Sequence, residues 1–409
     1  MKNEITIGKQ NTRFDWVLFW TVILLLIGYV FLHDLLGGTL FVHNAWDSYT
    51  LQAMAWRKGD VWLSQNYDYL EIAVYNGHYF VSFPPFPSVV MFPLTFIFGE
   101  KTPNNFIIMT FVILSVVFAY LSIRKMKVGD VGAMFWALFI VIGSNILWMS
   151  TMGGVWFLAQ ALNFLLCIAA VYSYLCNKKT LSLSLAALAV GCRPFSVFLL
   201  MAIFLLMLLD CINSRPHLNL WKTLKANIKY LLIPIVILIG YAVYNYIRFQ
   251  NPFEFGHNYL PEFSQANSEQ FGFQYFLDNL KNILMEPVKM HRNGTLDFSI
   301  FNGFMFYIAN PIFIVWFIYL AVDIAKRKMS LDKIVVAASF LINIVLLLVH
   351  KTFGGWQFGA RYTVDLIPYV FLYFILRGMK SPNKSELFLG GFAFLFNVYG
   401  TLAMTFKYQ

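Results

Sequence analysis

Apolar segments recur along almost the whole chain, and several are long enough to cross a lipid bilayer. A spanning helix needs about 20 apolar residues, and the first such run extends from Trp16 to Leu36. The chain is 59% hydrophobic and only 12% charged, with a mean hydropathy of +0.64, values that no soluble globular domain needs. The sequence therefore predicts an all-α polytopic membrane protein with a single membrane-embedded domain over residues 1–409.

The positions of lysine and arginine set the expected orientation, because cytoplasmic loops carry an excess of these residues. If the apolar run Pro85–Phe98 crossed the membrane, the basic cluster Arg124–Lys127 would face outward. We therefore expect this run to lie along the outer interface. The chain is then expected to cross the cytoplasmic membrane many times, with its N-terminus in the cytoplasm. About eleven spans result: Trp16–Leu36, Phe106–Ile123, Val131–Trp148, Val155–Cys176, Leu181–Gly191, Phe195–Leu209, Tyr230–Ile247, Phe301–Val322, Ile334–Val349, Tyr362–Leu376 and Leu387–Phe406.

Two long loops are expected on the outer side, over residues 37–105 and 249–300. The first contains Asn44–Arg57, whose apolar side chains recur on one face of an amphipathic helix. The middle of the second, Glu269–Met285, is polar enough to form a surface helix. The polar residues of the chain are thus expected to gather on one side of a helical bundle.

The first loop also predicts a small β-hairpin over Glu71–Ser82. Two β-prone runs flank Asn76-Gly77, the commonest two-residue hairpin turn. The implied pairing gives two faces: Ile72, Val74, Tyr79 and Val81 on one, and Glu71, Tyr75, His78 and Ser82 on the other. The polar face either lines a sugar site or covers the loop, and the residues alone favour neither interpretation.

Asp47 is the first acid of this loop. One interpretation is structural: an acid in the first helical turn, with Asn44 as N-cap, favours the helix dipole. The other is a general base or a metal ligand held at the membrane surface. Spacing alone favours the structural interpretation.

Basic residues on the outer side are candidates for binding an anionic headgroup. Arg193-Pro194 interrupts an apolar stretch, and its arginine either caps broken-helix carbonyls or binds phosphate; we favour phosphate. The run His350–Tyr362 has three glycines, Lys351, Trp356 and Arg361. It forms either an interfacial turn or, as we favour, an anion site. Asp365 is one helical turn from Arg361 and is a possible partner for it, and Arg292 is a weaker candidate cation.

Several other functions have no support in the sequence. The four cysteines lie in or beside apolar spans without a C-x-x-C pair, which disfavours a disulfide framework or a zinc site. The net charge of +10 is explained by the basic cytoplasmic loops, so no nucleic-acid partner is expected. No nucleotide-binding loop is present either, as fits a lipid-linked substrate.

The order of these motifs resembles the GT-C superfamily of membrane glycosyltransferases, which includes protein O-mannosyltransferases, lipid A aminoarabinose transferases and bacterial family 39-like enzymes. The resemblance covers most of the chain, and each motif is short. The motifs are Trp46-Asp47, Tyr79–Pro85, Arg193-Pro194, Tyr244–Gly256 and Gly355–Tyr362.

The resemblance implies an enzyme that passes a monosaccharide from a polyprenyl-phosphate donor to a glycan, lipid or protein acceptor outside the cytoplasm, usually with inversion. Carried over to this chain, it implies Asp47 as catalytic base or ligand to a divalent cation (Mg or Mn), and Arg193 and Arg361 as donor-phosphate contacts. From the residues themselves we expect Lys351 and Arg292 as further phosphate contacts, and as substrate-lining residues Glu71, Tyr75, His78, Tyr79 and Trp356. Two features depart from the family. The loop Ser150–Gly154 lacks the second acid of many relatives, which leaves metal dependence open, and Ser82-Phe83 replaces a lysine before Pro84-Pro85.

Two rival interpretations belong to other classes. A glycolipid transporter or flippase is typically built from repeated halves with ionisable groups near the midplane, whereas this chain concentrates polar residues on one side. A non-catalytic partner of an assembly complex would tolerate changes at Asp47.

Overall fold

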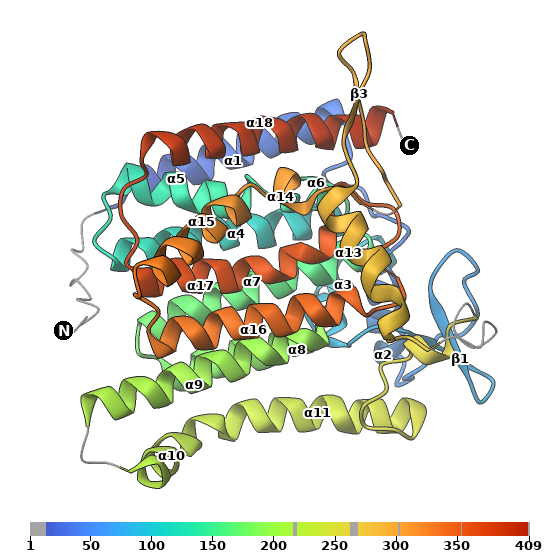
Figure 1. Ribbon diagram of the computed structural model, residues 1–409. Helices are drawn as coiled ribbons and strands as arrows, with labels where there is room; N and C mark the ends of the chain where they lie inside the picture. Colours follow the sequence, from blue (N-terminus) through green and yellow to red (C-terminus); the bar gives the residue numbers. More distant parts are fainter. Residues whose placement is uncertain (1–13, 216–218, 262–268, 302, 353, 408–409) are drawn as a thin grey trace.

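A bundle of helices that run side by side forms the body of the computed structural model, which describes residues 14–215, 219–261, 269–301, 303–352 and 354–407 (Figure 1). Each predicted span corresponds to a helix: α1 Trp16–Leu35, α4 Asn104–Lys125, α5 Asp130–Val141, α7 Val155–Leu175, α8 Lys179–Val190, α9 Val197–Ser214, α11 Leu232–Phe249, α15 Ile312–Ala325, α16 Leu331–Leu348, α17 Ile367–Arg377 and α18 Lys384–Phe406. Within the described ranges, seven helices are long and apolar enough to cross a membrane. The remaining predicted spans, at α5, α8, α15 and α17, form shorter helices. The prediction of a polytopic helical membrane protein is confirmed.

Helix α7 lies at the centre of the bundle. In the most apolar 18-residue stretch of α7, 89% of the residues are buried. In the corresponding stretches of α1 and of the segment Leu220–Phe249, which ends in α11, only 11% are buried. Because α1 and α11 keep most of their apolar side chains exposed, they form the outer surface, where lipid would take the place of protein neighbours.

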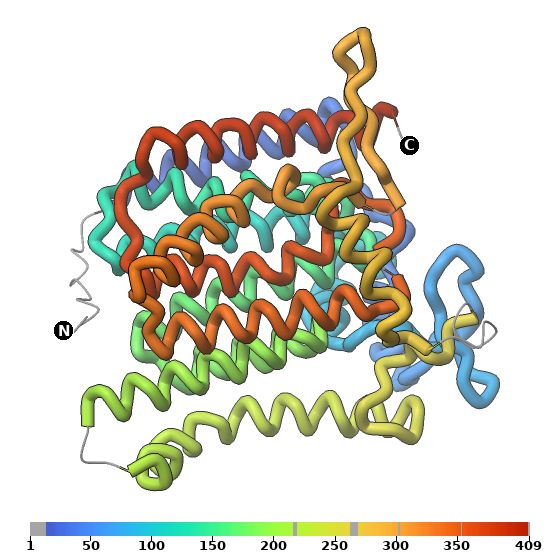
Figure 2. The backbone as a smooth tube through the Cα atoms, viewed as in Figure 1, coloured from blue at the N-terminus to red at the C-terminus, as the bar shows by residue number. Residues whose placement is uncertain are grey.

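The polar elements gather at one end of the bundle, on the right in Figures 1 and 2. They are α2 Ser48–Arg57, β1 Ile72–Tyr75, β2 His78–Val81 and α13 Phe276–Met285. The apolar helix α3 Phe86–Phe98 packs against α2 at the same end. The opposite end holds the start of α1, the end of α9 and the connections α4–α5, α15–α16 and α17–α18 (Figure 1). The short elements are α6 Ile146–Met149, α10 Leu220–Ile228, α14 Phe306–Ala309, β3 Lys289–Met290, β4 Leu296–Asp297, and the 3₁₀ turns η1 Gly99–Lys101, η2 Pro194–Ser196, η3 Lys229–Leu231, η4 His257–Tyr259, η5 Phe273–Tyr275 and η6 Arg361–Leu366.

The predicted hairpin forms with the predicted register. Strands β1 and β2 pair antiparallel, with Ile72 opposite Val81 and Tyr75 opposite His78. Asn76 and Gly77 adopt φ values of 49° and 76°, the left-handed conformations that this two-residue turn requires. The local turn signal was therefore sufficient to place both strands.

The first helix of the outer loop begins later than expected. It starts at Ser48 rather than at Asn44, and its N-cap is Asp47. Likewise, the surface helix expected over 269–285 begins at Phe276 as α13, after the 3₁₀ turn η5. Residues 262–268, just before it, lie outside the described part of the chain.

Candidate active site

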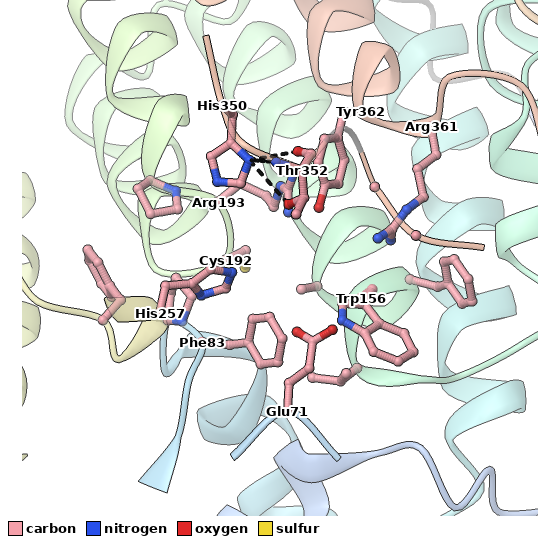
Figure 3. A pocket seen from close by; sticks show the side chains of 18 of the residues that line it. Glu71, Phe83, Trp156, Cys192, Arg193, His257, His350, Thr352, Arg361 and Tyr362 are labelled. Carbon is pink, nitrogen blue, oxygen red and sulfur yellow. Dashed lines mark hydrogen bonds between the residues drawn. The ribbon is translucent and has the colours of Figure 1, made fainter. Parts of the chain in front are cut away.

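A cavity of about 1110 Å³ opens at the polar end of the bundle. The first outer loop, the start of α7, the turn between α8 and α9, the second outer loop and the segment between α16 and α17 all contribute to its wall. Figure 3 shows Arg193, His350 and Arg361 on one side of it and Glu71 on the other. Five separate stretches of chain therefore meet around one space.

Arg361 places a buried cation in the wall of this cavity. Arg361 is only 4% exposed, and its side-chain atoms Nε and Nη1 have no hydrogen-bond partner among the described residues. The backbone is fixed at both sides, since Arg361 N donates to Gln357 Oε1 (2.9 Å) and Arg361 O accepts from Gln160 Nε2 (2.9 Å). The guanidinium carbon lies 4.9 Å from the Tyr362 ring centroid. A buried guanidinium with unused donors is suited to bind an anion.

Arg193 reaches the same cavity from the break between α8 and α9. Its Nε contacts Asp365 Oδ2 at 2.9 Å, and its guanidinium carbon lies 4.6 Å from the Tyr362 ring centroid. A hydrogen bond holds this break against the first outer loop: Phe86 N, at the start of α3, donates to Gly191 O (2.9 Å). Asp365 is thus the partner of Arg193, and the suggested pair of Asp365 with Arg361 does not form.

Among the described residues, two carboxylates line the cavity, Glu71 and Glu254. Glu254 already accepts from Gly256 N and Asn258 Nδ2 (both 2.6 Å), so Glu71 is the candidate for chemistry. The residue immediately precedes β1, and its backbone is fixed because Ser82 Oγ donates to Glu71 O (2.9 Å). Its carboxylate points into the space beside the Trp156 indole, with Arg361 on the far side (Figure 3). Burial raises the pKa of Glu71, and a hydrogen bond from Trp156 and the charge of Arg361 partly offset this rise. A carboxylate with a raised pKa is a stronger proton acceptor than an exposed one.

His350 lines the cavity as a neutral group at neutral pH. Burial lowers its pKa to about 4, and its Nδ1 lies 2.7 Å from Thr352 O. Lys351 and Trp356, also predicted for the site, line the same cavity. The positive charge of the wall therefore comes from Arg193, Arg361 and Lys351.

Asp47 does not line the cavity. The residue is fully buried, and its carboxylate caps α2: Oδ1 accepts from Tyr49 N (3.0 Å) and Thr50 N (3.2 Å). Its Oδ2 accepts from Thr50 Oγ1 and from Asn104 Nδ2 (3.1 Å). Burial raises the pKa of Asp47, and these hydrogen bonds partly offset the rise. The contacts of Asp47 are therefore structural, but not in the expected form: Asp47 is itself the N-cap, in place of Asn44, and its side chain orders the loop that carries Trp46.

No set of three His, Cys, Asp or Glu side chains suited to a metal ion occurs among the residues that the structure describes. Mg²⁺ and Mn²⁺ are held by oxygen ligands, commonly carboxylates, and the Asp47 oxygens already accept hydrogen bonds from the protein. These residues therefore do not form a site that fits the expected divalent cation.

Four other predicted site residues lie away from the cavity. Tyr75 packs against Tyr259, with ring centroids 4.6 Å apart. The His78 and Trp62 rings pack at a tilt, with centroids 4.4 Å apart, and Tyr79 O accepts from Leu63 N (2.7 Å). Arg292 is exposed between β3 and β4, on the hairpin that projects from the bundle in Figure 1. Beyond Glu71, the first hairpin extends away from the cavity, so its alternating side chains do not reach the opening.

Several lining residues were not predicted from the sequence. Trp46 and Trp156 enter from the first loop and from α7, and His257 enters from the second loop. His257 Nδ1 lies 2.9 Å from Ser82 O, which joins the two outer loops. A tryptophan directly before the first-loop acid and a histidine after Gly256 were the only local signals, and neither indicates which cavity the side chain enters.

Comparisons with known proteins give matches in structure only. No protein-family model and no curated protein matches the sequence. The archaeal oligosaccharyltransferase AglB from Archaeoglobus fulgidus, in complex with an inhibitory peptide and a dolichol-phosphate, aligns with a TM-score of 0.53 and 14% identity over 95% of this chain and 56% of its own. An apo form of the A. fulgidus oligosaccharyltransferase aligns with a TM-score of 0.53 and 13% identity, over the same shares of the two chains. ArnT from Cupriavidus metallidurans, bound to undecaprenyl phosphate, gives 0.48 and 14% identity over 88% of this chain and 60% of its own.

The chain has the GT-C fold. The alignment with AglB extends over nearly all of this chain, so the family resemblance seen in the motifs is confirmed at the level of the fold. The chain spans little more than half the length of the archaeal enzyme. Because one fold hosts many activities, the reaction must be argued from the site itself.

Proposed function

We propose that this chain is an integral-membrane glycosyltransferase that moves a monosaccharide from a polyprenyl-phosphate donor to an acceptor outside the cytoplasm. The observation that carries the proposal is the pair of unused donors on buried Arg361, across one cavity from the Glu71 carboxylate. An anion-binding group and a proton acceptor are the two parts that glycosyl transfer from a phosphate needs. That an archaeal protein of similar fold was solved with a dolichol-phosphate supports a lipid phosphate as the anion.

The proposed step needs no other reactant. The acceptor hydroxyl oxygen forms a bond to the anomeric carbon while its proton passes to the Glu71 carboxylate. The bond between the anomeric carbon and the phosphate oxygen breaks, and the electron pair leaves with the lipid phosphate. Arg361, Arg193 and Lys351 balance the charge of that phosphate. Attack from the face opposite the leaving group inverts the anomeric carbon.

The distribution of charge supports an outward-facing site in the cytoplasmic membrane. The basic residues Lys127, Arg215 and Arg327 follow α4, α9 and α15, at the end of the bundle opposite the cavity (Figure 1). Basic connections face the cytoplasm, so the cavity would face away from it. The N-terminal residues 1–13, also expected inside, lie outside the described part of the chain. A transporter is less favoured, because the cavity lies at one end of the bundle.

The proposal is tested by sugar transfer from synthetic donors. Purified protein in liposomes is given polyprenyl-phosphate carrying a labelled hexose or pentose, and release or transfer of label is measured. We expect Arg361→Gln to lower the rate by about 100-fold, since a fixed donor to a developing anion contributes about that much. Arg292→Gln, on the exposed hairpin, is the matched control and should keep the wild-type rate. Equal rates in both variants would remove Arg361 from the mechanism, and no release by the wild type from any donor would end the proposal.

A further inference from the structure

A second, smaller cavity of about 420 Å³ adjoins the first. Trp46, Glu71 and Trp156 belong to the walls of both. The remaining polar wall of the smaller cavity comes from Asn66, Asp68 and Tyr69, all in the first outer loop. Glu71 therefore stands where the two spaces meet, with the arginines on one side and this loop on the other.

The two cavities differ in charge. Among its described lining residues the smaller cavity has no Lys, Arg or His, and it does have the Asp68 carboxylate. The larger cavity has the three cations Arg193, Lys351 and Arg361. Its carboxylates are Glu71, which it shares with the smaller cavity, and Glu254, which accepts from Gly256 N and Asn258 Nδ2. An anion such as phosphate is attracted to the larger space and repelled by the smaller one. The smaller cavity is suited to a neutral ligand.

Aromatic rings form much of the smaller cavity. The Trp46 and Tyr69 rings meet edge to face with their centroids 5.8 Å apart, and the ring centroids of Trp46 and Trp156 lie 6.0 Å apart. The face of an aromatic ring carries partial negative charge and attracts the weakly positive C–H bonds of a sugar ring. Beside these rings, Asn66 Nδ2 donates to Asp68 Oδ1 (2.9 Å), which leaves Asp68 Oδ2 available to accept from a hydroxyl. Flat apolar faces with a few polar groups are what a pyranose ring requires.

The wall of the smaller cavity is held by long-range contacts. Val155 N at the start of α7 donates to Trp46 O (2.9 Å), which keeps Trp46 beside Trp156. Asp47, the residue that follows Trp46, caps α2. Because the bond between Val155 and Trp46 ties the first outer loop to α7, the two indoles stay side by side in the wall of the smaller cavity.

We infer that the smaller cavity binds a sugar ring of the acceptor, so that one of its hydroxyls reaches Glu71 at the junction. The acceptor is then a carbohydrate, whether a free glycan or a glycolipid headgroup, rather than a serine or threonine of a protein. The inference rests on the proposed function and names the acceptor class for that site. The lipid phosphate occupies the larger cavity and the acceptor ring the smaller one.

The test measures the Michaelis constants for donor and acceptor separately. The acceptors are octyl glucoside, octyl mannoside and octyl galactoside, with a serine- and threonine-containing peptide as the alternative class. Asp68→Asn and Tyr69→Ala change exposed side chains of the smaller cavity, and we expect each to raise KM for the octyl glycoside about tenfold. The donor KM, kcat and the slow release of label to water should not change. The reason is that each substitution removes binding energy that the acceptor gains equally in the ground state and in the transition state.

The matched controls are Asp60→Asn and His78→Ala, in the same loop but outside both cavities, and they should behave as the wild type. The inference would be overturned by transfer to the peptide, by transfer to neither acceptor class, or by an unchanged glycoside KM in both Asp68→Asn and Tyr69→Ala. In each of these cases, release of label by the wild type would still support the proposed function. A wild-type protein that releases no label from any donor would instead defeat the proposed function and this inference together.

Discussion

Arg193 and Asp365 form an ion pair of 2.9 Å although 172 residues separate them in the chain. Asp365 Oδ1 also accepts from Gln160 Nε2 of α7 (3.1 Å). The carboxylate thereby joins the break between α8 and α9 and the N-terminal part of α7 to η6, which leads into α17. Arg193 is held in place by the protein, whereas Arg361 keeps unused donors. The two arginines of the cavity therefore differ in their protein contacts: Arg193 pairs through Nε with Asp365, whereas Arg361 Nε and Nη1 have no partner among the described residues.

The Arg193–Asp365 pair gives the first prediction. Asp365→Asn leaves the charge of Arg193 without its partner, and we expect it to lower the stability by about 2 to 3 kcal/mol. Arg193→Gln should cost a similar amount. The double variant should cost less than the two single changes together, because each removes the same interaction. Thermal unfolding in one detergent measures all three, and additive losses would show that the pair contributes nothing.

Gly354 gives the second prediction. Its φ is +94°, and an added Cβ would lie 3.1 Å from Arg361 Nε and 3.3 Å from the Gln357 amide. Gly354→Ala should strain the backbone by about 1 to 2 kcal/mol and displace the guanidinium, so we expect a donor KM about tenfold higher. At neighbouring Gly355 a Cβ meets nothing within 4 Å, so Gly355→Ala is the control. Steady-state kinetics with varied donor would contradict the prediction if the two variants had the same KM.

The third prediction concerns pH. Burial raises the pKa of Glu71 above its ordinary value, and a general base acts only when deprotonated. Transfer should therefore be complete above this raised pKa and be lost as the pH falls through it. The acid limb of the kcat profile should have its midpoint above the ordinary glutamate pKa of about 4.3. A midpoint at or below that value would exclude Glu71 as the base.

A fourth prediction separates the two acids of the first loop. Glu71→Gln removes the proton acceptor and should lower kcat by about 100-fold or more with little change in stability. Asp47→Asn keeps a capping oxygen and should retain most of the rate. Asp47→Ala loses the cap and should lower stability by about 1 to 2 kcal/mol. If Asp47→Asn were instead as inactive as Glu71→Gln at unchanged stability, the base would be Asp47.

The bundle and the hairpin followed from local signals in the sequence. Apolar runs identify spans because the bilayer sets their length, and Asn76-Gly77 fixes a register that depends on two residues alone. The orientation of the Asp47 side chain could not be predicted from the sequence. An acid in the first helical turn and an acid at the N-cap differ by three positions or fewer, and the sequence does not fix where a helix begins that closely. Whether the carboxylate enters a cavity depends on Asn104, which is 57 residues away.

The partner of Asp365 illustrates a second limit. Spacing suggested a pair with Arg361, four residues earlier, as on an α-helix. The segment Arg361–Leu366 is instead a 3₁₀ helix, in which three residues complete a turn. Side chains four apart then point in different directions, so Arg361 faces the cavity and Asp365 faces Arg193. No local signal separates the two helix types here.

The hydrogen bond from Phe86 N to Gly191 O connects α3, expected at the membrane interface, to the chain two residues before Arg193. A thicker or thinner bilayer changes the depth at which an interfacial helix rests, and this bond would pass such a shift directly to the arginine. We therefore expect turnover to vary with the acyl-chain length of the surrounding lipids, even when donor and acceptor are saturating.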